Sequence, residues 1–415
     1  MMTQCAEVAV ASTAMPLALG TLTSLVLPFL NKSKLGSYTP TMATPILVSA
    51  AVLGLSPLSA PVGRVRRYAS ALRRTRGVPV SNPADAPAWD GQGTLRVVSW
   101  NIQYCAGIER EFFYDGGRAV STDANVVEAY ATSIGDALAA LNPDVVLLQE
   151  VDRRSRRTHK IDQLDRIGRC LPELRSRCSA AYWRVPYVPS PKWEHVGRIG
   201  MHSAVISRYR LGKGTRTQLP LLREKWYRKF FNLRRALLDV EMAVESGEGS
   251  LSALHLLNTH LSAFSGADDT LSRQVAELCK RAEALNAKGS PWLMAGDFNA
   301  LPVASTHGLG EYSTPAHDPR LALANDAPRE AEYYALSSPL RPLFESGRAV
   351  VDASAHASDP RRWHTYKPFH EEAPVCAIDH AFSSKELVVT NVEVVQTGGK
   401  YLSDHQPLLI DFQLK

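Results

Sequence analysis

The stretch "LMAGDFNALP", residues 293–302, is an apolar run that ends at an acid, Asp297, and an amide, Asn299. Gly, Asp, Asn and Pro favour turns, so the run predicts a buried strand followed by a turn. Strand ends are also where a rigid support can hold catalytic groups. This stretch alone leaves both interpretations open, and the rest of the chain has to separate them.

Five further apolar runs end in the same way. Their last residues are Asn101, Glu150, His260, Asp379 followed by His380, and Asp404 followed by His405. Turn formation explains any one of these residues, and a lone histidine is more often a hydrogen-bonded core or surface residue than a catalyst. Six apolar runs that each end in a group able to bind a metal ion or move a proton indicate a catalytic site.

These residue types suit the attack of water on a phosphate ester. Carboxylate oxygens such as those of Glu150 and Asp404 favour a hard cation, Mg²⁺ or alternatively Mn²⁺, which neutralises phosphate charge. A neutral histidine can take a proton from water, and an Asp on its other ring nitrogen fixes its tautomer. Asn and His donors can stabilise the oxygens of the five-coordinate transition state.

The motifs that carry these residues also resemble a known family. In chain order they are "SWNI", "LLQEVD", "SAVISRY", "NTHLS", "GDFNALP", "ID" and "SDHQPLL". As a set they resemble the endonuclease/exonuclease/phosphatase superfamily, which includes deoxyribonuclease I-like nucleases and neutral sphingomyelinases. The resemblance covers about residues 94–415. It implies an α/β fold, a four-layer α/β sandwich in which two mostly antiparallel sheets pack face to face between flanking helices.

The resemblance also implies a metal site. Glu150 matches the principal metal ligand, and Asn101 matches the amide beside the metal. Asp404 matches a second carboxylate, which lies on the metal side or supports the catalytic histidine. Gln103 departs from the family pattern, because some members have a metal-binding carboxylate two residues after the asparagine.

The remaining matches are to catalytic positions. His405 matches the general base that activates water, and Asp379 matches the acid that orients it. Asp297 and Asn299 match the pair that orients water and supports the leaving group and phosphate. His260 matches the phosphate-binding imidazole of the deoxyribonuclease and sphingomyelinase branches.

Hydrophobic periodicity predicts the elements of this domain. We expect strands over residues 94–102, 144–152, 202–211, 234–244, 251–261, 291–299, 373–384, 386–396 and 405–414. We expect helices over residues 124–143, 270–289 and 331–345.

The first 93 residues differ from this pattern. Residues 8–30 and 35–63 carry no charge, and each stretch is long enough to cross a bilayer. We therefore expect residues 1–76 to form a hydrophobic and basic N-terminal segment that anchors the chain to a membrane or targets it to an organelle. Residues 77–93, rich in Pro, Gly and Asp, are expected to be a linker to a catalytic domain over 94–415.

Composition limits the other readings. The net charge is +6, but residues 94–415 hold 39 basic and 38 acidic residues, so the domain is not a globally basic nucleic-acid binder. Two local basic runs, 153–157 and 208–235, form either a solvated surface or a cleft that attracts phosphate. The six cysteines show neither zinc spacing nor a disulfide framework, which favours reduced thiols.

The sequence thus predicts a Mg²⁺-dependent phosphodiesterase that uses a water activated by a His–Asp pair. Its substrate partner is expected to be a nucleic acid or a phospholipid head group, with membrane association through residues 8–63. The alternatives are a scaffold that has the fold without the chemistry, and a membrane- or nucleic-acid-binding protein. The sequence does not predict the oligomeric state.

Overall fold

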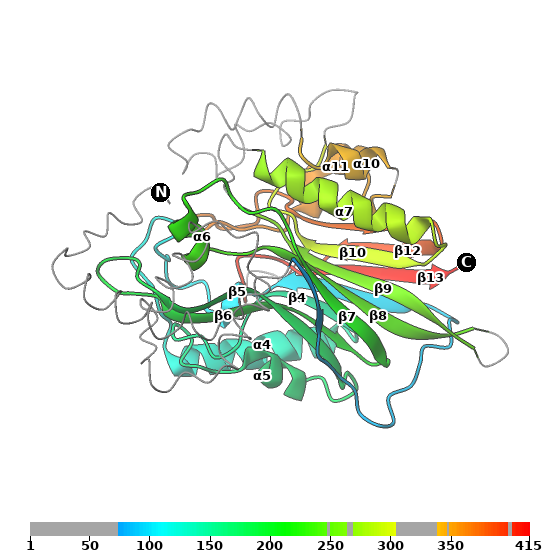
Figure 1. Ribbon diagram of the computed structural model, residues 1–415, viewed down its shortest axis with the longest axis horizontal. Helices are drawn as coiled ribbons and strands as arrows, with labels where there is room; N and C mark the ends of the chain where they lie inside the picture. The colour runs from blue at the N-terminus through cyan, green and yellow to red at the C-terminus, as the bar shows by residue number, and fades with distance from the viewer. Residues whose placement is uncertain (1–73, 247–249, 264–268, 304–337, 347, 397–400) are drawn as a thin grey trace, which may run out of the picture. The chain divides into compact units, whose positions relative to one another are not determined.

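The computed structural model describes residues 74–246, 250–263, 269–303, 338–346, 348–396 and 401–415. In this part of the chain the strands form two sheets (Figure 1). The first sheet has the order β1-β7-β8-β9-β10-β11, with β1 Thr75–Val78, β7 Leu211–Gln218, β8 Ala236–Ser246, β9 Ser250–His260, β10 Trp292–Asp297 and β11 Asp379–Ser383. The second has the order β12-β13-β3-β4-β6-β5-β2, with β12 Leu387–Val394, β13 Leu408–Leu414, β3 Leu95–Asn101, β4 Val145–Asp152, β6 Gly197–Ser207, β5 Ser176–Val188 and β2 Val80–Ser81.

Both sheets are mostly antiparallel, with one parallel pair inside each. In the first sheet β10 runs parallel to β9, and in the second β3 runs parallel to β4. Parallel neighbours end at the same edge of a sheet. The last residues of β9 and β10, and those of β3 and β4, therefore come together.

Alternation along the strands divides the core between the two faces of each sheet. Val145 and Leu147 of β4 lie in the cluster between the sheets, whereas Val146 and Leu148 lie in the cluster beneath the helices. Both sets are fully buried. A strand covered on both faces reads as a continuous apolar run, which is why "VVLL" and "LMA" carry no polar residue.

Helices cover the outer face of each sheet (Figure 1). α4 (Ala124–Ala140) and α5 (Gln163–Arg169) lie on the second sheet, and α7 (Thr270–Asn286) lies on the first, near α10 (Arg341–Glu345) and α11 (Ala353–Ser358). In α7 the buried apolar residues recur every three or four positions: Leu271, Val275, Leu278, Ala282 and Leu285. This spacing gives one apolar face for the sheet and one polar face for water. The predicted four-layer α/β sandwich is confirmed.

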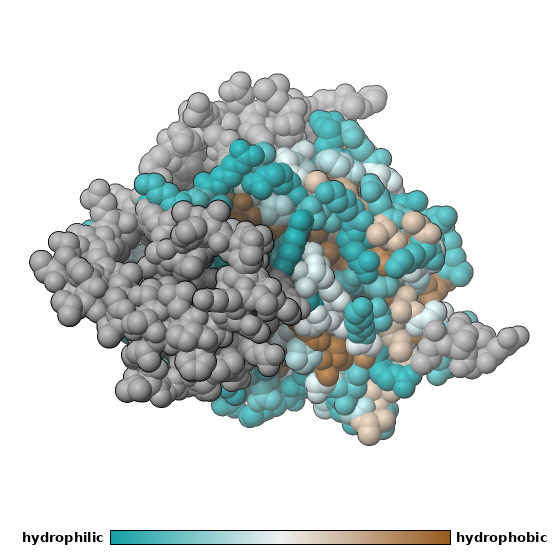
Figure 2. Space-filling view, in the orientation of Figure 1, coloured by the Kyte–Doolittle hydropathy of each residue, from teal (hydrophilic) through white to brown (hydrophobic). Residues whose placement is uncertain are grey.

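Three short helical segments complete the description. They are the 3₁₀ segments η4 (Gln103–Cys105) and η8 (Pro360–Trp363), and the helix α6 (Trp226–Phe231). Hydrophilic residues cover much of the described surface on the face seen in Figure 2, with hydrophobic residues in smaller patches between them.

The expected linker over residues 77–93 is not a linker. β1 pairs with β7, β2 pairs with β5, and Trp89 is buried in the core between the sheets. The folded unit accordingly begins at Arg74. The Pro and Gly residues that suggested a linker mark turns around short edge strands, where proline is tolerated.

Two other predictions fall largely outside the described residues. Residues 1–73, which contain both uncharged stretches, are not described, and neither are residues 304–337, which hold part of the expected helix over 331–345. Among the described helices, none is long and apolar enough to cross a membrane. The five described cysteines are free, three of them buried and two half-buried.

Candidate active site

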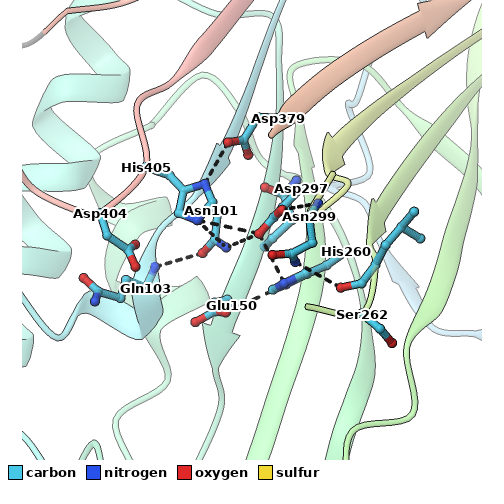
Figure 3. A network of polar contacts seen from close by, with 12 residues as sticks. Asn101, Gln103, Glu150, His260, Ser262, Asp297, Asn299, Asp379, Asp404 and His405 are labelled. Atoms are coloured by element: carbon cyan, nitrogen blue, oxygen red, sulfur yellow. Dashed lines mark hydrogen bonds and ion pairs between the residues drawn. The ribbon is translucent and has the colours of Figure 1, made fainter. Parts of the chain in front are cut away.

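The predicted site residues meet at one end of the two sheets (Figure 3). The register places Asp297, the last residue of β10, beside His260 of β9 on one side and Asp379 of β11 on the other. From the second sheet come Asn101, the last residue of β3, and Glu150 of β4. The loop before β13 supplies Asp404 and His405.

His405 and Asp379 form a buried pair. The Nδ1 atom of His405 lies 2.7 Å from Oδ2 of Asp379, and the Asp379 backbone N–H donates to Thr365 Oγ1. Burial acts to lower the pKa of His405, but the carboxylates of Asp379, Asp297 and Asp404 outweigh it and raise that pKa to about 10. Nε2, the other ring nitrogen, faces Asn101 at 3.5 Å and Asp297 at 3.6 Å.

Asp297 lies at the centre of the network. Its Oδ2 atom accepts a hydrogen bond from Asn101 Nδ2 at 3.0 Å and lies 3.2 Å from His260 Nε2. Burial raises the pKa of Asp297 to about 6, although His405 and Asn101 act in the opposite direction. Its other oxygen, Oδ1, accepts from the backbone N–H of Asn299 at 2.9 Å.

A chain of hydrogen bonds fixes the tautomer of His260. The Glu150 backbone N–H donates to the Tyr182 hydroxyl at 3.2 Å, and that hydroxyl lies 3.1 Å from His260 Nδ1. Burial, together with Arg235 and His405, lowers the pKa of His260 well below 6.5, so the ring is neutral. The Tyr182 hydroxyl therefore donates to Nδ1, and Nε2–H points to Asp297.

Backbone distortions place two of these side chains. The pairing of β4 with β6 shifts between Leu148 and Val151, and Glu150 within this bulge has a left-handed backbone, with φ of 58°. Bulges re-aim side chains next to active sites. Asn299 is also left-handed, with φ of 50°, and its side-chain amide donates to Leu261 O at 3.1 Å.

Gly296 allows the close approach of β10 to β9. Its φ is +149°, and a Cβ atom at this position would lie 2.0 Å from the carbonyl oxygen of Thr259. Only glycine fits here, because any side chain would push apart the strands that carry His260 and Asp297.

The metal-side residues gather excess negative charge. Burial, followed by Glu150 and Asp297, raises the pKa of Asp404 to about 7, although His405 and Ser403 oppose the shift. The Asp404 carboxylate accepts a hydrogen bond from the Ser403 hydroxyl at 3.1 Å, whereas Asp379 contacts Nδ1 of His405. Asp379, and not Asp404, therefore supports His405, and a place for Asp404 on the metal side stays a prediction.

These residues fit a hard cation. Within the described ranges, no group of three or more His, Cys, Asp or Glu side chains is arranged to hold a metal ion. Mg²⁺ usually takes only one or two protein carboxylates and fills its other positions with water and substrate phosphate. Glu150 and Asp404 can supply the carboxylates, and Asn101 an amide oxygen that already accepts from the Gln103 N–H at 3.1 Å.

Sequence reasoning missed two residues of this site. Tyr182 lies on β5, a strand that periodicity did not predict. Asp115 is in the loop after η4, and burial, followed by Asp404 and Glu150, raises its pKa well above 3.8. Asp115 follows only the short aromatic run 112–114, and Tyr182 lies in a segment of mixed composition, so neither belongs to the motifs that mark the other site residues.

His380, Trp363 and Tyr366 pack around the site. His380 Nε2–H donates to Ala300 O at 2.9 Å, and the ring packs on Phe298, beneath the site. Trp363 is buried in the core, and the ring of Tyr366 lies 5.2 Å from that of His405.

Several arginines of the two basic runs are used inside the protein. Arg157 is buried against Asp152 at 2.8 Å, and Arg153 is paired with Asp162. In the second run Arg208 is paired with Asp144, and the buried Arg216 donates to backbone carbonyls. These four arginines therefore have partners within the protein, and attraction of phosphate by the other basic residues of the two runs stays a prediction.

Comparison with known proteins gives one family match. The model of the Endonuclease/Exonuclease/phosphatase family matches residues 98–405. None of the curated proteins compared matches the chain.

Several solved structures are similar to it. An endonuclease/exonuclease/phosphatase from Beutenbergia cavernae is 22% identical, with a TM-score of 0.42, and covers 78% of this chain and 72% of that one. The human Nocturnin catalytic domain is 17% identical, with a TM-score of 0.46, over 80% of this chain and 97% of that one. A truncated TDP2 from Caenorhabditis elegans is 16% identical, with a TM-score of 0.42, over 77% and 97%.

Proposed function

Because the chain belongs to the endonuclease/exonuclease/phosphatase family, we propose that it is a Mg²⁺-dependent phosphodiesterase. Hydrolysis of phosphate esters is the general chemistry of this family. The observation that carries the proposal is the network in which Asp379, His405, Asp297 and His260 meet at the ends of paired strands.

In this proposal His405 takes the proton from the attacking water. Its Nδ1 is held by Asp379, so Nε2 is the nitrogen that faces the reaction centre. Asp297 lies 3.6 Å from Nε2 and can hold the same water from its other side. A pair of this kind orients the base and stabilises the imidazolium that forms.

The amides and the second imidazole support the phosphate. Neutral His260 presents Nε2–H beside Asp297, and Asn101 presents its Nδ2 group to the same carboxylate. Asp297 holds these donors in place, and they stabilise developing charge on phosphate oxygens once the substrate shares their N–H groups.

Glu150, Asp404 and Asn101 are the residues proposed to hold the cation. When bound, Mg²⁺ would neutralise phosphate charge and offset the charge of Asp404, one of the three carboxylates that raise the pKa of His405. Mn²⁺ suits the same oxygen ligands.

The experiment is hydrolysis by the full chain, with Mg²⁺ and with a chelator. The substrates are bis-p-nitrophenyl phosphate, supercoiled DNA, sphingomyelin vesicles and a soluble inositol polyphosphate. Chelator-sensitive turnover of a diester supports the proposal, and the preferred substrate identifies a nuclease or a phospholipase. Turnover of the inositol polyphosphate alone contradicts the phosphodiesterase assignment and indicates a phosphomonoesterase.

Membrane association or organelle targeting through residues 8–63 stays a prediction. It rests on the two uncharged stretches and the arginines that follow them. Sedimentation of the full chain with vesicles, compared with a chain lacking residues 1–73, tests the membrane alternative.

A further inference from the structure

One arginine beside the site differs from the other buried arginines. Arg235 is only 8% exposed, and its Nη1 atom is buried without a hydrogen-bond partner. No described residue forms a hydrogen bond or an ion pair with its guanidinium. Arg157 and Arg216 are also buried, but Arg157 is paired with Asp152. The Nη1 atom of Arg216 lacks a partner too, but the other nitrogens of that guanidinium donate to Ala181 O and Arg234 O.

The place of Arg235 in the fold directs it to the reaction centre. It precedes β8, whose neighbour β9 ends at His260, and its carbonyl is fixed by the Leu219 N–H at 2.8 Å. Its guanidinium carbon lies 5.3 Å from the centre of the Tyr182 ring. The His260 ring centre lies 5.4 Å from that same ring. Arg235 and His260 thus both pack on the tyrosine.

The charge of Arg235 reaches the site residues. It contributes to lowering the pKa of His260, after burial, and also acts to lower the pKa of Asp297. A buried cation without a fixed anionic partner is unfavourable by itself. A buried cation of this kind is retained where an anionic ligand supplies the missing negative charge, because the gain in function then outweighs the loss of stability.

We propose that the Arg235 guanidinium binds the scissile phosphate of the substrate, on the side of the site formed by Tyr182 and His260. A guanidinium matches two oxygens of one phosphate group, and burial strengthens the contact. The inference rests on the proposed function for the identity of its ligand as a phosphate ester. Its observable consequence is anion binding that needs neither metal nor turnover.

The test is thermal unfolding of the full chain with chelator, at constant ionic strength, with and without inorganic phosphate. The variants are Arg235→Met, Arg235→Lys and the control Arg210→Met, which removes an exposed arginine. We expect phosphate to raise the Tm of the wild type and of Arg210→Met. In Arg235→Met the affinity for phosphate should fall by at least about tenfold, and Arg235→Lys should retain part of it.

A second readout separates binding from a structural role. Without phosphate, Arg235→Met should unfold at the wild-type temperature or above it, because an unpaired buried charge has been removed. A lower Tm for Arg235→Met contradicts the proposal, as does a phosphate-induced shift that survives this substitution.

Failure here is distinct from failure of the proposed function. Chelator-sensitive hydrolysis with phosphate binding that is independent of Arg235 overturns this inference alone. Phosphate binding that depends on Arg235, in a chain that hydrolyses none of the esters, supports the anion site and overturns the proposed reaction.

Discussion

The hydroxyl of Tyr182 joins the two halves of the site, because it accepts from the Glu150 N–H and donates to His260. Tyr182→Phe keeps the ring and removes this link. We expect kcat/KM to fall by about 10- to 100-fold, as for other residues that orient a metal-site or catalytic group. The loss of partners for a buried N–H and a buried ring nitrogen should also lower the free energy of unfolding by about 1–3 kcal/mol.

Steady-state kinetics and urea unfolding measure the two effects. Tyr209→Phe is the matched control, since Tyr209 lies against Trp89, in another part of the core. An unchanged kcat/KM in Tyr182→Phe would show that His260 needs no such support.

At the level of single residues, the sequence identified the groups that end apolar runs and missed those that support them. His405, Asp379 and Asp297 were predicted because each follows or lies in a quoted motif, and the structure brings them together. Arg235 was one of ten Lys/Arg between residues 208 and 235, and charge alone does not tell a buried cation from a solvated one. Burial and the absence of a partner depend on packing, which local sequence does not record.

Among the elements, β9 and β10 must lie close enough for His260 to reach Asp297. Gly296→Ala adds a Cβ atom 2.0 Å from the Thr259 carbonyl oxygen, at a backbone angle that only glycine adopts readily. We expect the free energy of unfolding to fall by about 3 kcal/mol or more, and turnover to be lost as Asp297 shifts.

Gly289→Ala is the control that separates the effect of the steric clash from the effect of the positive φ angle. Gly289 also has positive φ, +64°, but a Cβ atom there meets nothing within 4 Å. Its substitution should cost about 1 kcal/mol and leave turnover intact. Equal losses of stability in the two variants would mean that the close approach of the strands is unimportant.

The helix α11 contains a buried histidine that makes the domain sensitive to acid. Burial, followed by His380, lowers the pKa of His356 to about 3 from 6.5, although Asp352 opposes the shift. Between these two values the unfolded chain binds a proton that the folded chain does not. The free energy of unfolding is therefore at its full value above about pH 6.5 and falls as the pH decreases.

His356→Phe keeps the aromatic contacts with Phe344 and Trp363 and removes this titration. Between about pH 6.5 and 4.5 the wild type should lose up to about 2–3 kcal/mol more than the variant. Urea unfolding at the two pH values measures the difference. The control is His370→Gln, at an exposed position; a pH dependence that is identical in His356→Phe and wild type would refute the assignment.

The sequence predicted the strands whose two faces are both buried, and the strands that it did not predict are partly exposed. "VVLLQE" and "LMAGD" are apolar on both sides, so β4 and β10 were predicted. β7, "LGKGTRTQ", has two glycines and two basic residues, and β5, "SRCSAAYWRVPYV", mixes small, basic and aromatic residues. These strands are held by pairing with their neighbours, a long-range effect that a local pattern does not contain.

For the whole molecule, the boundary of the domain is the clearest correction to the sequence prediction. The fragment 74–415 keeps β1, β2 and Trp89, whereas 94–415 removes them. Trp89 packs edge-on against Phe412, and its backbone pairs with Ala243 and Glu245. We expect the shorter fragment to be less stable by about 3–5 kcal/mol or more, comparable to deleting a buried tryptophan. Thermal unfolding of the two fragments tests this boundary. Equal Tm values would mean that residues 77–93 are a linker after all.

The central claim is that this fold brings a His–Asp pair and metal-binding carboxylates to one phosphate. The most direct measurement is turnover of bis-p-nitrophenyl phosphate by the full chain, with and without Mg²⁺. It should be compared among the wild type, His405→Ala, Glu150→Ala and the control His370→Ala. We expect Mg²⁺-dependent turnover in the wild type and the control, and losses of about 10²–10⁴-fold or more in the other two without unfolding. Near-normal turnover by folded His405→Ala or Glu150→Ala, or turnover unaffected by chelator, would contradict the account.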